Sequence, residues 1–158
     1  MWTDWDENIS SFIQLADKHH VRMLMVGGGA VSFHGYKRHS ADVDFWIETT
    51  PENFKKLMLV FMEMGYEITD FPTEVKEQRQ NISVKFFPSS LNLELITNFS
   101  VNKPFSSAYK DSIEASLVQN PLVKWRVLSY EDLIVSKIKS SRPKDLLDIQ
   151  ELKRINEK

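Results

Sequence analysis

The sequence predicts an α+β (α/β mixed) fold, in which a mixed β-sheet is flanked by helices and two helices end the chain. Segments with helical periodicity alternate with short apolar or alternating segments, which is the order expected when helices cover a mixed sheet. The chain has 158 residues, of which 42% are hydrophobic, and this is enough for a real core. We therefore expect a single domain over residues 1–158.

The first half of the chain alternates helices and strands. The predicted elements are a helix over 7–20, a buried strand over 21–26, a short helix over 28–36, a strand over 43–48 and a helix that starts at Pro51. Thr50 suits the N-cap of that last helix and Gly65 suits its end. The apolar face expected to pack inward is formed by Phe54, Leu57, Met58, Phe61 and Met62.

The second half adds strands and then the two final helices. The predicted elements are alternating strands over 81–88 and 91–97 with a turn at 88–90, a strand over 120–129, and helices over 130–141 and 143–157. Ser129 and Asp132 have the spacing of a capping box, and Pro143 suits the first position of the final helix.

Bulk composition excludes several classes of protein. The net charge of −2 provides no general attraction to nucleic acid or membrane, and the absence of cysteine excludes disulfides and zinc–thiolate sites. The N-terminus is acidic and polar, unlike a secretory signal, and the longest apolar run is too short for a membrane span. We expect a soluble, cytoplasmic protein with no membrane partner.

Three acidic residues are candidate metal ligands. Asp42 and Asp44 flank Val43 on a predicted strand, so both carboxylates leave the same face of the sheet. Adjacent carboxylates repel unless a cation neutralises them, and Mg²⁺ is often held by one or two carboxylates together with substrate phosphates. Glu94 lies between Leu93 and Leu95 on another predicted strand and is a candidate third acid. The alternatives are a solvated strand face for the aspartates and an exposed position for Glu94.

A glycine run precedes the aspartates. Gly27, Gly28 and Gly29 follow a predicted strand and precede a predicted helix, where backbone amides are suited to bind phosphate. The spacing fits neither the dinucleotide-binding fingerprint nor the P-loop. A tight turn without any ligand is the alternative.

Two sequence patterns in this chain resemble those of known families. The first pattern consists of Val26, Gly27, Gly28, Asp42, Val43, Asp44 and Phe45, with Glu94 later in the chain. It resembles the nucleotidyltransferase fold of the DNA polymerase beta superfamily. A longer pattern consists of Gly27, Gly28, Ala30, His34, Gly35, Arg38, Ser40, Asp42 and Asp44, followed by Asp132, Leu133, Ile134, Lys137, Arg142, Pro143, Lys144, Asp145 and Asp148. It resembles the small AbiEii-type bacterial nucleotidyltransferases over roughly residues 22–155.

The resemblance implies an enzyme that transfers a nucleoside monophosphate from an NTP to an acceptor hydroxyl, with Mg²⁺ (or Mn²⁺) as cofactor. The implied catalytic and metal-binding residues are Asp42, Asp44 and Glu94, and the implied nucleotide-binding residues are Gly27, Gly28, Arg38, Ser40 and Lys137. We assign no chemistry to His34, and we expect Asp145 and Asp148 to pair with nearby cations at least as much as to act in chemistry.

The sequence leaves the biological role open. The acceptor is a tRNA, a protein or a small molecule, and a toxin role with an antitoxin partner is one possibility. The alternative to an enzyme is a catalytically retired nucleotide- or partner-binding module of the same fold.

Overall fold

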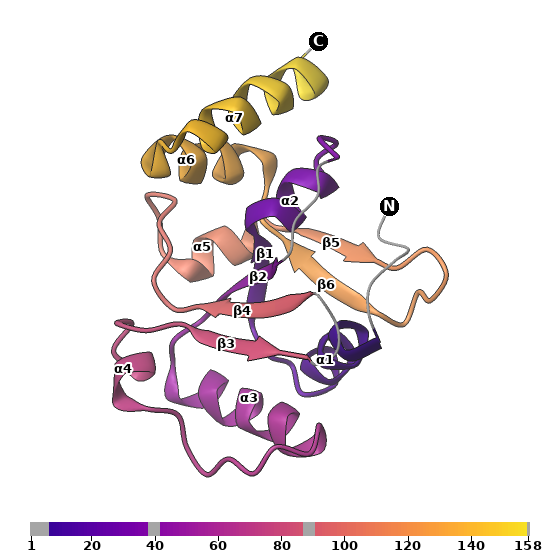
Figure 1. The fold of residues 1–158 in the computed structure, drawn as a ribbon, viewed down its shortest axis with the longest axis vertical. Helices are drawn as coiled ribbons and strands as arrows, with labels where there is room; N and C mark the ends of the chain where they lie inside the picture. The colour runs from indigo at the N-terminus through magenta and orange to yellow at the C-terminus, as the bar shows by residue number, and fades with distance from the viewer. Residues whose placement is uncertain (1–6, 38–41, 87–90, 158) are drawn as a thin grey trace.

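The computed structural model describes residues 7–37, 42–86 and 91–157, and its centre is a six-stranded sheet in the order β3-β4-β2-β1-β6-β5 (Figure 1). The strands are β1 (Met23–Val26), β2 (Asp42–Ile47), β3 (Ile82–Lys85), β4 (Asn92–Ile96), β5 (Ile113–Ser116) and β6 (Lys124–Val127). β2 is parallel to β4 and β1 is parallel to β6, whereas the pairs β1–β2, β3–β4 and β5–β6 are antiparallel. The predicted mixed sheet is confirmed.

Helices lie on both faces of this sheet. They are α1 (Glu7–Lys18), α2 (Gly27–Phe33), α3 (Pro51–Glu63), α4 (Thr73–Lys76), α5 (Phe105–Lys110), α6 (Tyr130–Ser140) and α7 (Pro143–Asn156). Phe12 of α1 contacts both Phe45 of β2 and Phe61 of α3, so α1 and α3 cover the face toward which Phe45 points. Trp46 points the other way and contacts Phe105 of α5. The second face therefore carries α5.

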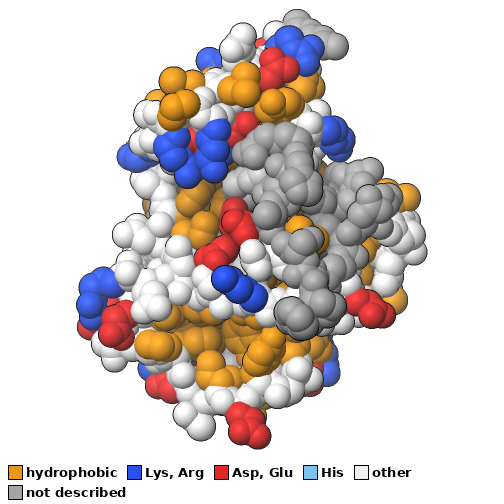
Figure 2. All heavy atoms as spheres, viewed as in Figure 1, with side chains coloured by type: hydrophobic (Ala, Val, Ile, Leu, Met, Phe, Trp, Pro, Cys, Tyr) orange, Lys and Arg blue, Asp and Glu red, His pale blue; other side chains and the backbone are white. Residues whose placement is uncertain are grey.

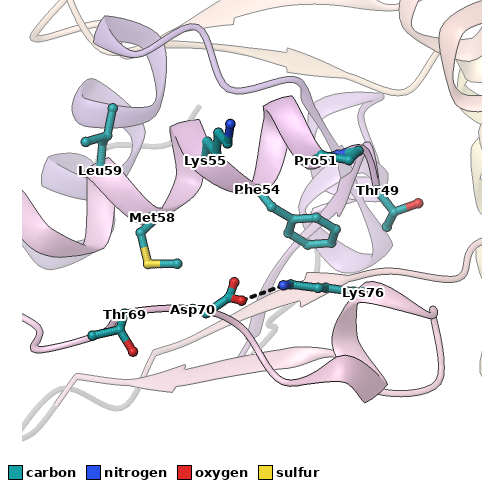
Figure 3. A pocket seen from close by; sticks show the side chains of 9 residues that line it. All are labelled: Thr49, Pro51, Phe54, Lys55, Met58, Leu59, Thr69, Asp70 and Lys76. Carbon is teal, nitrogen blue, oxygen red and sulfur yellow. Dashed lines mark hydrogen bonds and ion pairs between the residues drawn. The ribbon is translucent and has the colours of Figure 1, made fainter.

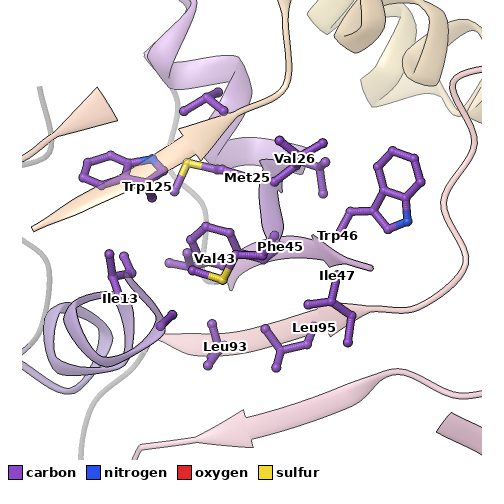
Figure 4. Packing of buried hydrophobic residues seen from close by; sticks show 14 of the residues in the cluster. Ile13, Met25, Val26, Val43, Phe45, Trp46, Ile47, Leu93, Leu95 and Trp125 are labelled. Carbon is purple, nitrogen blue, oxygen red and sulfur yellow. The ribbon is translucent and has the colours of Figure 1, made fainter. Parts of the chain in front are cut away.

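The main core lies between the central strands and the helices α1 and α3. Figure 4 shows the part of it where Ile13 of α1 lies near the side chains of the central strands. Val43 and Phe45 of β2 lie beside Leu93 and Leu95 of β4, and all four side chains are buried. Because side chains alternate along a strand, the residues between them project to the opposite face. Burial of this apolar set thus decides which face the polar residues of β2 and β4 occupy.

Several predicted helix boundaries are confirmed. The Thr50 hydroxyl accepts a hydrogen bond from the backbone N–H of Asn53, as expected for the N-cap of α3. Gly65 follows that helix with φ of 96°, a conformation that favours glycine. The Ser129 hydroxyl accepts from the N–H of Asp132 and caps α6. These local signals worked because the partners are three residues apart.

Other predictions need correction. Met62 was expected on the packed face of α3, but it is 54% exposed, and Val60 is buried instead. The inner stripe contains Phe61, and the next residue is rotated by about 100° around a helix, which turns Met62 toward solvent. The elements α4, α5 and β5 were not predicted, since four to six residues are too few to show a clear period. The predicted turn at 88–90 lies outside the described residues.

None of the described helices has both the length and the apolar content that crossing a bilayer requires.

Candidate active site

Asp42 and Asp44 stand on the face of β2 opposite the main core. Val43 between them is buried, Asp42 is exposed and Asp44 is partly buried. In the antiparallel pair of β1 and β2, Asp44 lies opposite Val26, the last residue of β1. The chain leaves β1 at this point and enters α2 directly, so the glycine run begins beside the second aspartate.

Gly27 makes the closest approach to the acids. Its φ is +62°, and a Cβ atom placed on it would lie 2.4 Å from Oδ2 of Asp44. Any larger residue would have to adopt an unfavourable conformation and also displace the carboxylate. Gly27 and Gly28 line the same cavity as Asp42 and Asp44. The glycine run therefore lets the start of α2 share one site with the acids.

Glu94 joins the same face from β4. The parallel register places Glu94 opposite Asp44, and the flanking Leu93 and Leu95 are buried on the other face. A register shifted by one residue would have turned Glu94 to the opposite face, away from Asp42 and Asp44, and the structure does not have that register. On its other side, Glu94 accepts a hydrogen bond from the Ser83 hydroxyl of β3, with Oγ and Oε1 2.5 Å apart.

A basic wall completes the cavity, which has a volume of about 280 Å³. It comes from α6, from the start of α7 and from the turn between them, and its charged members are Lys137, Arg142, Lys144 and Asp145. Figure 2 shows acidic side chains in the middle of this face, with a group of lysine and arginine side chains just above them. In this site, carboxylates on the sheet and cations on the C-terminal helices therefore line the same cavity.

Lys137 is the buried member of this wall. Its ammonium lies 3.2 Å from Oδ1 of Asp145 and 3.0 Å from Oδ2 of Asp148, and all three side chains are almost fully buried. Arg142 donates from its Nε to Oδ2 of Asp145 at 2.8 Å. Desolvation alone would raise the pKa of Asp145, but the hydrogen bonds from Arg142 and Lys137 lower it overall. Pairing of Asp145 and Asp148 with nearby cations was expected from the sequence, and the structure identifies the partners.

The environment of Asp44 favours its protonated form. Burial, followed by the charges of Asp42 and Glu94, raises the pKa of Asp44 to about 6, and Lys144 and Lys137 oppose that shift. A carboxyl group with these neighbours binds a proton or a cation more readily than an isolated one. The cluster has the electrostatics of a cation site.

The acids do not form a preformed metal cage. Within the described part of the chain, no three histidine, aspartate or glutamate side chains gather closely enough to hold an ion by themselves. Two carboxylates on one face nevertheless fit Mg²⁺, which commonly takes one or two protein carboxylates and completes its shell with water and phosphate oxygens. Asp42 and Asp44 are the residues that fit this role.

The comparison with known families agrees with this geometry. A family model described as a nucleotidyltransferase of unknown function (DUF6036) matches residues 3–157. The chain belongs to this family of nucleotidyltransferases. Among curated proteins, none matches the sequence.

A solved structure supports the fold of this nucleotidyltransferase. The crystal structure of ANT(2")-Ia in complex with adenylyl-2"-tobramycin is similar to it, with a TM-score of 0.54 and 14% sequence identity. The match covers 93% of this chain and 86% of that chain. At this level of identity the similarity shows the nucleotidyltransferase fold alone.

Two predicted nucleotide-binding residues, Arg38 and Ser40, lie outside the described residues.

His34, to which we assigned no chemistry, lies within the described residues. Its Nε2 is 2.8 Å from the carbonyl oxygen of Leu128, and burial lowers its pKa. Neutral His34 therefore ties the end of α2 to the segment between β6 and α6, which is a structural contact.

Sequence reasoning missed two polar neighbours of the acids in the nucleotidyltransferase. Ser83 was not selected because a single serine on an alternating strand carries no signal. Lys144 was part of the pattern that resembles the AbiEii-type enzymes but was not selected as a site residue, yet it lines the acidic cavity. Ser83 lies opposite Glu94 through the pairing of β3 with β4, and Lys144 lines the cavity from α7, far from the acids in sequence.

A larger hollow, of about 690 Å³, lies away from the acids of the nucleotidyltransferase (Figure 3). It lies between α3 and the segment around residues 69–76, and apolar side chains such as Phe54 and Met58 line it. Its only described acidic lining residue, Asp70, is ion-paired with Lys76 at 2.6 Å. The described residues around this hollow include no pair of carboxylates like Asp42 and Asp44, so they offer no comparable site for phosphoryl transfer.

Proposed function

We propose that this nucleotidyltransferase transfers a nucleoside monophosphate from an NTP to an acceptor hydroxyl and requires Mg²⁺ or Mn²⁺. The observation that supports this most directly is the alignment of Asp44 with Glu94 on one face of the sheet, next to the glycine turn. Phosphoryl transfer depends mainly on positioning and charge stabilisation. A site that places acids, backbone amides and cations around one cavity offers both.

Asp42 and Asp44 hold the divalent ion in this proposal. When bound, the ion supplies positive charge to the phosphates and to the acceptor oxygen. The raised pKa of Asp44, caused by burial and by the charges of Asp42 and Glu94, means that neutralising this cluster relieves repulsion.

The remaining residues orient the reactants. Backbone amides at Gly27 and Gly28 face the triphosphate, because no side chain blocks the start of α2. Glu94 orients the acceptor hydroxyl and takes its proton. The acceptor oxygen forms a bond to the α-phosphorus, the bond from that phosphorus to the bridging oxygen breaks, and pyrophosphate leaves.

The acceptor is a tRNA, a protein or a small hydroxyl compound. The related structure contains adenylyl-2"-tobramycin, which is a nucleotidylated small molecule. We therefore place small polyhydroxyl compounds first among the acceptors to test. tRNA and candidate proteins follow as separate arms of the same assay.

The test is an incubation of each α-³²P-labelled NTP with these acceptors and Mg²⁺ or Mn²⁺. Wild type should label at least one acceptor class, and Asp44→Asn should label none. Glu94→Gln should keep NTP binding by calorimetry but lose transfer. Absence of transfer from wild type to every class would favour the binding module over the enzyme.

A toxin role is a further part of the proposal, motivated by the resemblance to AbiEii-type enzymes. Induced expression should then arrest growth, and the product of an adjacent gene should relieve the arrest. Asp44→Asn is the matched control, and growth arrest by this variant would contradict a role based on transfer.

A further inference from the structure

The basic wall of the site has an internal charge balance. Lys137 and Arg142 contribute two positive charges, and Asp145 and Asp148 contribute two negative charges. Three ion pairs of 2.8–3.2 Å connect the four residues. Because the cations and carboxylates neutralise one another, this cluster adds little net charge to the cavity.

Lys144 differs from these neighbours. It is exposed and lines the cavity with Asp42 and Asp44, and its charge, like that of Lys137, lowers the pKa of Asp44. Within residues 7–37, 42–86 and 91–157, no carboxylate forms an ion pair with it. Among the residues that the structure describes, Lys144 is thus a cation at the site that forms no ion pair with a carboxylate.

The balanced cluster fixes the backbone from which Lys144 projects. Asp145 receives hydrogen bonds from the backbone N–H and the side chain of Arg142. These bonds connect the residues before and after Lys144 in the first turn of α7. Lys137 connects the same turn to α6. The backbone at Lys144 is therefore held in place while its side chain remains exposed, which reduces the backbone entropy lost when a ligand is bound.

We propose that Lys144 contacts the polyphosphate of the NTP directly, and that Lys137 is a positioning residue that holds α7 against α6. This inference rests on the proposed function and divides the basic wall into one ligand-binding cation and one structural cation. A compact ammonium suits a phosphate chain held opposite two aspartates. For Lys137 to reach a ligand, its ammonium would have to give up its ion pairs with the buried carboxylates of Asp145 and Asp148.

The inference is tested with three lysine-to-methionine variants, which remove the same charge and keep much of the apolar stem. Lys144→Met and Lys137→Met are the test variants. Lys139→Met is the control, because Lys139 is exposed on α6 and does not line the cavity. Calorimetry with Mg²⁺–tripolyphosphate and with each Mg²⁺–NTP gives affinity, and thermal unfolding gives stability.

Lys144→Met should weaken binding of both probes by about tenfold to a hundredfold, the loss expected for a charge-assisted contact, without a change in Tm. Lys137→Met should lower Tm by roughly 6–20 °C, because it removes the buried cation that is ion-paired with the buried carboxylates of Asp145 and Asp148. Lys139→Met should match wild type in both measurements. Lys144→Arg should restore much of the affinity lost in Lys144→Met.

Two results would overturn the inference while the proposed function stands. One is wild-type affinity in Lys144→Met, and the other is a loss of Tm in Lys144→Met as large as in Lys137→Met. If wild type binds neither tripolyphosphate nor any NTP with Mg²⁺, the proposed function fails together with the inference. Lys144 is exposed, so Lys144→Met is expected to fold. Its affinity therefore tests the inference even if Lys137→Met does not fold.

Discussion

Gly27 and Asp44 approach one another so closely that a Cβ on the glycine would lie 2.4 Å from Oδ2 of the aspartate. Asp44 is paired with Val26, the last residue of β1, and Gly27 is the first residue of α2. The contact therefore connects the sheet to the start of this helix. It explains why a residue without a side chain stands at this position. The backbone that would face phosphate and the carboxylate that would hold metal form one unit.

Gly27→Ala should abolish binding of Mn²⁺ and NTP, because the new methyl group displaces Asp44. Gly65→Ala is the matched control, since Gly65 also has positive φ but has open space around its Cβ position. Both variants should lose about 1 kcal/mol of stability from the unfavourable backbone conformation. Chemical denaturation and Mn²⁺ titration separate the two effects. Equal Mn²⁺ affinities in the two folded variants would show that the contact does not matter for the site.

Metal binding should depend on pH near the raised pKa of Asp44, which is about 6 because of burial and the charges of Asp42 and Glu94. A proton competes with the metal below that pKa, so the Mn²⁺ affinity should fall by up to about tenfold per pH unit as the pH drops below 6. Titrations between about pH 5 and pH 7.5 measure this slope, and Asp44→Asn should be nearly flat. A steep slope that survives in Asp44→Asn would assign the proton to another group.

The same pKa shift has a consequence for stability without metal. The folded state binds a proton at Asp44 more tightly than the unfolded state, whose aspartate titrates near its usual pKa. This contribution therefore favours the folded state at low pH and is lost as the pH rises through about 6. Added Mg²⁺ should restore stability at pH 7 in wild type and much less in Asp44→Asn.

Ser83→Ala should lower kcat for transfer by about tenfold and leave the KM for NTP unchanged. The Ser83 hydroxyl holds Oε1 of Glu94, and without it the carboxylate of Glu94 samples other orientations. Ser83→Thr keeps a hydroxyl and suits a strand, so it should retain most of the activity. A similar loss in Ala and Thr variants would argue against orientation through this hydrogen bond.

Asn53→Ala should destabilise the fold by about 2–4 kcal/mol without a direct effect on the site. The buried Asn53 side chain accepts from the N–H of Arg22 and donates to the carbonyl oxygens of Arg22 and Glu48. Its removal takes away the side-chain partner of the Arg22 N–H and of the Glu48 carbonyl oxygen, at the ends of β1 and β2. Urea denaturation measures the loss, and Asn98→Ala is a control at an exposed position. A loss below about 1 kcal/mol would mean that water replaces the amide.

Local sequence patterns predicted much of the fold. Alternation along residues 42–47 placed Asp42 and Asp44 on one face and Val43 on the other, as the structure has them. The caps at Thr50 and Ser129 were also predictable, because capping partners are three residues apart. The predictions failed where elements are short, as in α4 and β5, and at Met62, where burial depends on the direction from which α1 packs.

The sequence by itself determined which residues share a face, because the strand period of two and the helix period of 3.6 are properties of the local backbone. Only the tertiary structure decided that Glu94 lies opposite Asp44, that Ser83 holds Glu94, and that Lys137 is neutralised while Lys144 faces the acids. These relationships join segments up to about a hundred residues apart, and no local period specifies them. Strand register and helix packing produce these relationships. Burial of Leu93 and Leu95 fixes the face on which Glu94 lies, and burial of Lys137 with Asp145 and Asp148 fixes how α7 packs on α6.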